Sequence, residues 1–183
     1  MRTLVIHPDD RSTDFLRPIY QNIKGATLFT QDKSEGEVRE AIEEHDQILM
    51  MGHGSGAGLF NVSRLGIGGM AIDSSHVNLL KDKRCIFIWC NADRFVKRYS
   101  LKGLYTGMFI SEVIEAAYCG LKEQDQQTID QSNDFFASLL SGLLGEGLAD
   151  YKLVFEEVKE AYGKLAAVNE VASYNHQRWY ING

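Results

Sequence analysis

The sequence predicts an α/β protein with a mostly parallel sheet of roughly six strands. Short apolar runs alternate along the chain with longer segments whose apolar residues recur at helical spacing, and this alternation is typical of α/β folds. The run Arg84 to Trp89 is nearly all apolar after its first residue. A strand that is apolar on both faces suits the middle of a parallel sheet that helices cover.

Six segments have the length and composition of strands. They are Leu4 to His7, Ala26 to Thr30, Gln47 to Met51, Arg84 to Trp89, Leu104 to Ile110 and, as an edge strand, Arg178 to Asn182. Residues 55 to 82 are rich in Gly and Ser, so they are expected to be irregular, apart from a small hairpin near Met70 to Ile72.

Helices are expected between and after these strands. Phe15 to Ile23 has helical spacing behind a cap at Thr13 or Asp14, and Pro18 inside it predicts a late start or a kink. Ser34 to Glu37 is a capping box that opens an acidic helix. The apolar side of that helix is formed by Val38, Ala41 and Ile42.

Three further helices are predicted toward the C-terminus. Ser111 caps the first, and the other two carry apolar residues between Phe135 and Leu144 and between Val154 and Leu165. The apolar face of the first is expected to consist of Val113, Ile114, Ala117 and Leu121.

The composition is that of one globular domain. The chain has 183 residues, of which 44% are hydrophobic and 24% charged, and this argues against disorder. We therefore expect a single domain over residues 1–183. The net charge of −6 gives no general attraction to phosphate backbones or anionic lipid. Nucleic acids and membrane surfaces are therefore not expected partners.

The three cysteines, Cys85, Cys90 and Cys119, form neither a CxxC pair nor the Cys/His spacing of a zinc site. No disulfide framework, metal site or cofactor is predicted, and the pattern fits a reducing compartment. The segment Leu4–Ile6 is too short for a signal-peptide core, and no stretch approaches the ~20 apolar residues of a membrane span. A cytoplasmic location is the expectation.

Two strands end in residues that can carry chemistry. His53 follows one strand and Cys90 follows the next long one. Ligands of open parallel sheets lie outside the carboxyl ends of the strands, so neighbouring strands would bring the two side chains together. A nearby imidazole favours the reactive thiolate and later donates a proton to a leaving amine. The backbone N–H groups of Gly54 and Cys90 are then candidates for an oxyanion hole.

Each residue of this pair also has a structural interpretation. A cysteine that closes an apolar strand, as Cys90 does, is most often a small buried hydrophobe, and a lone histidine before a glycine, such as His53, is more often structural. Cys85, within the strand or at its start, is expected to be a core residue. The glycines also fit a loose dinucleotide fingerprint over Gly52 to Ala57, with Asp73 about 20 residues further on. That motif needs a helix at the glycines, and the many glycines after Ala57 argue against one.

The pair His53-Gly54 after one apolar strand and Cys90 after the next resembles the caspase-like (clan CD) cysteine peptidases, which include caspases, metacaspases, legumains, gingipains, separases and CHAT domains. The segment Trp89 to Phe95 is most similar to the gingipain segment around the nucleophile, and the helix at Asp134 to Gly142 is similar to the C-terminal helices of CHAT domains.

The resemblance covers roughly residues 3 to 167 and implies a caspase-like three-layer α/β/α sandwich. It also implies a thiol protease, a hydrolase that cuts polypeptides through a His53–Cys90 dyad and a thioester, without a metal. Ile88-Trp89 departs from the family pattern before the nucleophile, and Trp89 is expected to narrow the cleft. The alternative is a catalytically silent caspase-like scaffold that binds a partner protein. The sequence leaves the oligomeric state open.

Further residues are expected to contact the substrate. By analogy of position, Asp9 or Asp10 after the first strand would lie next to His53 and favour Arg or Lys at the cleavage position through a charge-assisted bond. The other interpretation is that two aspartates after a strand are ordinary turn formers. The remaining candidates for substrate contact are Ser55, Trp89, Asn91 and Asp93.

Overall fold

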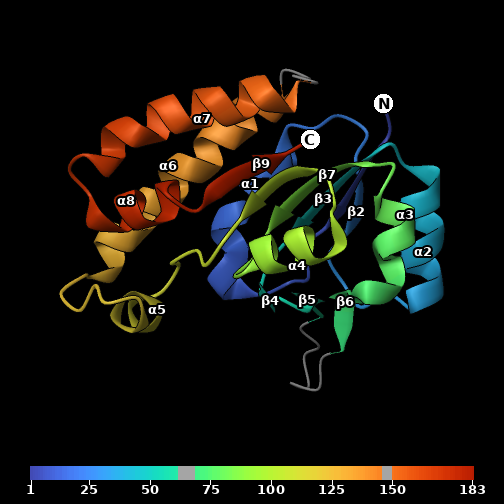
Figure 1. Cartoon of the computed structure of the whole chain (residues 1–183), viewed down its shortest axis with the longest axis horizontal. Helices are drawn as coiled ribbons and strands as arrows, with labels where there is room; N and C mark the ends of the chain where they lie inside the picture. The colour runs from blue at the N-terminus through green and yellow to red at the C-terminus, as the bar shows by residue number, and fades with distance from the viewer. Residues whose placement is uncertain (62–68, 146–149) are drawn as a thin grey trace. The chain divides into compact units, whose positions relative to one another are not determined.

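The computed structural model describes residues 1–61, 69–145 and 150–183, which divide into two compact units. The first unit comprises Met1–Asp10, Gly25–Gly107 and Tyr180–Gly183. The second comprises Arg11–Lys24 and Met108–Trp179. The colours of Figure 1 follow the chain through both units.

The first unit is built on a six-stranded sheet with the strand order β2-β1-β3-β7-β8-β9 (Figure 1). The pairs from β2 through β8 are all parallel, which confirms the prediction of an α/β protein with a mostly parallel sheet. The strands are β1 (Thr3–Ile6), β2 (Thr27–Phe29), β3 (Gln47–Met51), β7 (Arg84–Ile88), β8 (Gly103–Thr106) and β9 (Trp179–Asn182).

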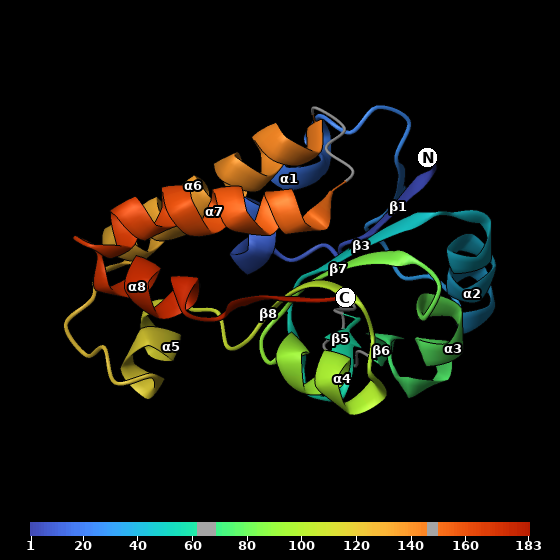
Figure 2. The same cartoon turned by 45° about the horizontal axis from the view of Figure 1, so that its top comes forward.

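The middle of this sheet is apolar because its strands are covered on both faces. Every residue of β3 is buried, and so is β7 from Cys85 onward. Helices α2 (Glu35–Glu44), α3 (Val77–Leu80) and α4 (Ala92–Tyr99) cover one face and share a core with it (Figure 2). The predicted capping box begins α2, since Ser34 and Glu37 bond each other's backbone N–H groups.

A second, three-stranded sheet occupies part of the segment that was expected to be irregular. It consists of β4 (Gly54–Ser55), β5 (Gly58–Phe60) and β6 (Met70–Ile72), paired antiparallel, and the β5–β6 pair confirms the hairpin near Met70 to Ile72. The 3-10 turn η2 (Ser74–His76) leads from β6 into α3. Because β4 and β5 follow the glycines where the dinucleotide fingerprint needs a helix, that alternative interpretation of the motif is wrong.

The second unit is helical. Pro18 is the first residue of its first α-helix, behind a 3-10 turn, so the late start predicted for this helix is confirmed. Helices α3, α4 and α8 were not predicted. The elements of the second unit are η1 (Arg11–Leu16), α1 (Pro18–Gln21), α5 (Val113–Tyr118), α6 (Gln126–Gly145), α7 (Tyr151–Ala166) and α8 (Glu170–His176).

The apolar face expected for α5 is wrong. Val113 and Ile114 are 43% and 64% exposed, and the buried residue of the helix is Ala116. Glu115 accepts hydrogen bonds from the backbone N–H groups of Ser111 and Glu112. The Glu115 carboxylate therefore folds back toward the start of the helix and caps it. Ala116 packs in a cluster of buried apolar residues with Ile110, Ile129 and Val171.

Candidate active site

The two strands that carry the predicted dyad are neighbours. Strands β3 and β7 pair in parallel with Met51 opposite Ile88, and the backbone N–H of Gly52 continues the ladder to the Ile88 carbonyl at 3.0 Å. His53 and Cys90 therefore each lie two residues beyond the last paired position of neighbouring strands. Both side chains are half-buried, so they are held by the protein and still meet solvent.

A carboxylate from the first strand approaches the histidine. Strand β1 pairs with the other edge of β3, with Ile6 opposite Met50. The segment after β1 carries Asp10 to within 4.0 Å of His53, measured from Oδ1 to Nε2. Asp9 is exposed, and its backbone N–H donates to the Thr30 carbonyl. The structure thus brings Asp10, one of the two aspartates expected near His53, within 4.0 Å of the imidazole.

Cys90 lies in a tight strand-to-helix turn. Asn91, the residue after it, adopts the left-handed conformation with φ 64° and caps α4, and its N–H donates to the Gly107 carbonyl. Asparagine tolerates this conformation better than most residues. The turn sets Cys90 two residues before the first residue of α4, where the positive end of the helix dipole favours a negative charge.

Gly54 packs directly on the indole of Trp89. A Cβ at Gly54 would overlap Trp89 and come 2.6 Å from the Gly58 carbonyl oxygen. In the antiparallel ladder the His53 carbonyl accepts from the Phe60 N–H, so alternation points the N–H of Gly54 away from β5. This orientation places the Gly54 N–H outside the β4–β5 ladder.

Trp89 does not lie where the sequence placed it. Its side chain is only 2% exposed and belongs to the core beneath α4, rather than to an open cleft. The reason is strand alternation, because Trp89 falls on the same face of β7 as Cys85 and Phe87. Its indole N–H donates to the Ser55 carbonyl at 3.0 Å. Trp89 therefore supports the turn that carries Gly54.

Two other expected substrate contacts have structural partners. The Ser55 hydroxyl accepts from the Ala57 N–H at 3.1 Å within the β4–β5 turn. Asp93, in the first turn of α4, pairs with Lys97 at 3.1 Å. The hydrogen bond from Lys97 to Asp93 raises the pKa of the Lys97 ammonium. Ser55 and Asp93 are both half-buried.

The three cysteines have different surroundings. Cys85 is fully buried in the core, as expected, and burial raises the pKa of its thiol to about 12. Cys119 is half-buried in the second unit, where it ends α5. Cys90 is the one that follows the carboxyl end of a strand, next to the strand end that bears His53.

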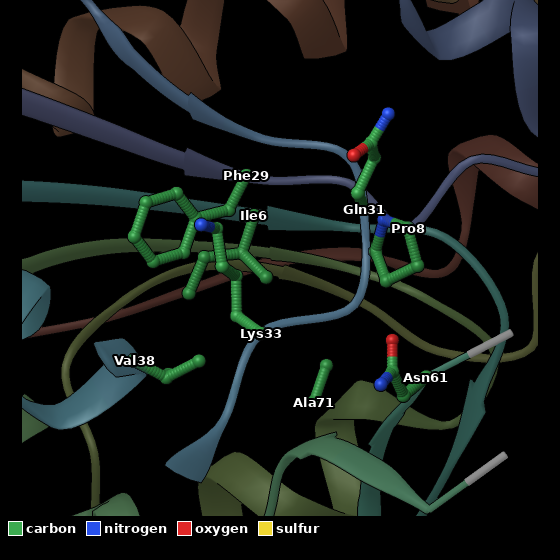
Figure 3. A pocket seen from close by; sticks show the side chains of 8 residues that line it. All are labelled: Ile6, Pro8, Phe29, Gln31, Lys33, Val38, Asn61 and Ala71. Atoms are coloured by element: carbon green, nitrogen blue, oxygen red, sulfur yellow. The ribbon is translucent and has the colours of Figure 1, made fainter. Parts of the chain in front are cut away.

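Two features of this edge were not found from the sequence. The stem of Arg94 on α4 packs over Gly56, where a Cβ would come 3.0 Å from that of Arg94. A cavity of about 10 Å³, room for roughly one water molecule, lies beside the ends of β1 and β2 (Figure 3). Its lining comes from segments far apart in the chain, so no local pattern could reveal it. It is lined by Ile6, Pro8, Phe29, Gln31, Lys33, Val38, Asn61 and Ala71.

No family model and no curated protein matches this chain. Among the residues that the structure describes, no helix is long and apolar enough to cross a membrane.

Proposed function

We propose that the chain is a cysteine endopeptidase with a caspase-like three-layer α/β/α fold, in which Cys90 is the nucleophile and His53 the general base and acid. The observation that carries the proposal is the pairing of β3 with β7, which sets the strand ends bearing His53 and Cys90 side by side. A thiol beside an imidazole at the carboxyl edge of a parallel sheet suits acyl transfer.

In the proposed reaction His53 takes the thiol proton, and the Cys90 thiolate attacks the carbonyl carbon of the scissile bond. A C–S bond forms, and the N–H groups of Gly54 and Cys90 stabilise the negative charge on the carbonyl oxygen. The imidazolium then returns the proton to the leaving amine as the C–N bond breaks. Water, deprotonated by His53, hydrolyses the thioester and frees the thiol. These steps are complete without a metal ion or another cofactor.

The proposed substrates are polypeptides with Arg or Lys at the cleavage position. Of the two carboxylates after β1, Asp10 supports this choice because it is half-buried, and a half-buried carboxylate favours a cationic partner through a charge-assisted bond. Ser55 and Asn91 flank the dyad in the chain and are proposed to contact the substrate backbone. Three free cysteines support a reducing compartment, and a cytoplasmic location is part of the proposal.

A panel of fluorogenic peptides with Arg, Lys, Asp or Asn at the cleavage position tests the proposal. We expect hydrolysis of the Arg and Lys peptides by the wild-type chain. The Cys90→Ala and His53→Ala variants should each lose at least ~10³-fold in kcat/KM, and the double variant should lose little more, because the two residues act as one unit. Hydrolysis by Cys90→Ala at the wild-type rate would reject the assignment.

The second candidate is a catalytically silent scaffold that binds a partner protein. It is favoured by α5, whose side chains Val113, Ile114 and Tyr118 are exposed, since clustered exposed apolar residues mark interaction surfaces. Under this alternative no peptide of the panel is cleaved, and charged substitutions on α5 abolish partner binding while Cys90→Ala leaves it unchanged.

A further inference from the structure

A cavity of about 340 Å³ lies in the second unit, whereas His53 and Cys90 belong to the first. Its walls come from η1, from the two residues that precede α5 and from the first half of α6. This volume is within the range of small-molecule sites. Such sites are usually lined by apolar side chains, but the lining of this cavity is mostly polar and charged. The cavity therefore suits a charged ligand.

Hydrogen bonds and a ring contact shape the walls of the cavity. The side-chain amide of Gln126 donates to the Ser111 carbonyl at 3.2 Å and to Oδ1 of Asp130 at 2.8 Å, so α6 is tied to the segment before α5. On η1, the ring of Phe15 stacks on that of Phe109, with centroids 6.4 Å apart and planes inclined by 9°. Phe15 is half-buried and supplies an apolar surface among the polar groups.

The lining carries charges of both signs. Arg11 is its cation, and its carboxylates are Glu112, Asp130 and Asp134. Asp130 and Asp134 lie four residues apart on α6, so their side chains share a face of the helix. Within residues 1–61, 69–145 and 150–183, no side chain pairs with Arg11 or Asp134, and both are exposed. Carboxylates alone would suit any cation, but Arg11 also requires an anionic group in the ligand.

We propose that this cavity binds a free basic amino acid, a small molecule with two cationic groups, one carboxylate and an aliphatic chain. The Arg11 guanidinium binds the ligand carboxylate through two parallel hydrogen bonds. The three carboxylates of the lining bind the two cationic groups, and the aliphatic chain packs on Phe15. One cation and three carboxylates give the lining a net charge of −2, which attracts a ligand whose own net charge is positive.

The mixture of charges discriminates against simpler ligands. A diamine has no anion for Arg11, and an amino acid with an apolar side chain has one cationic group for three carboxylates. A metal ion is a poorer fit as well. In the part of the chain that the structure describes, no group of three or more His, Cys, Asp or Glu side chains is placed to hold one.

Isothermal titration calorimetry of the full chain with L-lysine tests the proposal, with norleucine and cadaverine as comparison ligands. Norleucine lacks the side-chain ammonium group, and cadaverine lacks the carboxylate. We expect saturable binding of L-lysine below about 10 mM. Each comparison ligand should bind at least ~10-fold more weakly, because each lacks one charge-assisted hydrogen bond.

Variants of the lining locate the bound lysine. Arg11→Gln and Asp134→Asn should each weaken the affinity for L-lysine roughly ten-fold, since each removes one charged partner. Arg11→Gln should not weaken the affinity for cadaverine, which has no carboxylate. The matched controls Arg98→Gln on α4 and Glu157→Gln on α7 remove the same charges at exposed positions outside the cavity. They should bind L-lysine like the wild type.

Asp10→Asn distinguishes this cavity from the candidate active site, where a carboxylate is also proposed to bind cationic side chains. We expect Asp10→Asn to bind L-lysine with the wild-type affinity. Weaker binding in Asp10→Asn but not in Asp134→Asn would assign the lysine to the active site and overturn the inference. No saturable binding at about 10 mM, or binding of cadaverine as tight as that of L-lysine, would overturn it too. None of these outcomes depends on peptide hydrolysis.

Discussion

Cys85 and Cys90 lie five residues apart, yet only one of them meets solvent. The Cys85 thiol is enclosed on the apolar face of β7 and donates to the Leu80 carbonyl. Burial raises its pKa from 9.0 to about 12, so the folded state holds this proton more tightly than the unfolded state does. The stabilisation is complete below pH 9 and is lost progressively as the pH rises toward 12.

We therefore predict that urea unfolding of the wild type loses free energy between pH 8 and pH 10 more steeply than unfolding of Cys85→Ala does. The cavity that Cys85→Ala leaves lowers the free energy of unfolding by the same amount at every pH. It therefore does not affect the slopes that are compared. Parallel slopes would mean that Cys85 titrates alike in the folded and unfolded chain.

Gly54 is predicted to tolerate no side chain. In Gly54→Ala the new methyl group would overlap Trp89 and press on the Gly58 carbonyl oxygen, so we expect a loss of about 1–3 kcal/mol from overpacking. The matched control is Gly36→Ala in α2, where a Cβ meets no atom within 4 Å and stability should rise by up to about 1 kcal/mol. Equal unfolding midpoints for the two variants would contradict the packing described for Gly54.

At the scale of single helices and strands, the sequence predicted the features that depend on residues close together in the chain. The capping box at Ser34 was found because its hydrogen bonds span three residues, and the strands were found because parallel strands are continuously apolar. The face of α5 was not found, since a six-residue helix has too few residues to define an apolar stripe. Helix α4 was missed although Asn91 is a residue type that favours helix starts and its buried residues Ala92, Phe95 and Val96 have helical spacing.

The capping box supplies a prediction at this scale. In Ser34→Ala the Glu37 N–H loses its partner at the start of α2, so the free energy of unfolding should fall by about 1 kcal/mol. Denaturation with urea measures it, and Ser74→Ala, at an exposed position outside α2, is the control. An unchanged midpoint in Ser34→Ala would show that the cap contributes nothing.

Asn175 in α8 holds a buried turn of the second unit. Its side-chain amide accepts from the Ile110 N–H at 2.8 Å and donates to the Ile110 carbonyl at 3.1 Å, with no exposed surface. Asn175→Leu leaves both backbone groups buried without that partner, and we predict a loss of about 2–3 kcal/mol. A loss below about 1 kcal/mol, measured in a urea titration, would contradict the role given to these two hydrogen bonds.

At the scale of the whole molecule, strand order is what the sequence left undetermined. The apolar runs predicted six strands, but placing β1 beside β3 and β3 beside β7 depends on contacts between residues more than 30 positions apart. The proximity of His53 to Cys90 and of Asp10 to His53 was therefore conditional on an assumed order. Trp89 is buried because it alternates along β7 onto the face that packs in the core. Its place in the sequence next to Cys90 suggested instead that it lines a cleft.

The sheet order also predicts where the molecule is most rigid. Amide hydrogens of β3 and β7 lie between neighbouring strands, whereas β2 is an edge strand, so exchange with solvent should be slowest in β3 and β7. Hydrogen exchange followed by mass spectrometry of peptides measures this. Exchange in β3 as fast as in β2 would contradict the order of the strands that support the candidate site.

The proposal that Cys90 is a nucleophile activated by His53 is tested most directly with a peptidyl ketone that carries a leaving group and a Lys residue at the cleavage position. The cysteine that this reagent alkylates is the quantity to determine. We expect one covalent adduct on Cys90 of the native wild-type chain, located by mass spectrometry, and no adduct on Cys85 or Cys119. The reaction should be at least ~10²-fold slower in His53→Ala. Labelling of Cys119 as fast as Cys90, or labelling of Cys90 that His53→Ala leaves unchanged, would contradict the proposal.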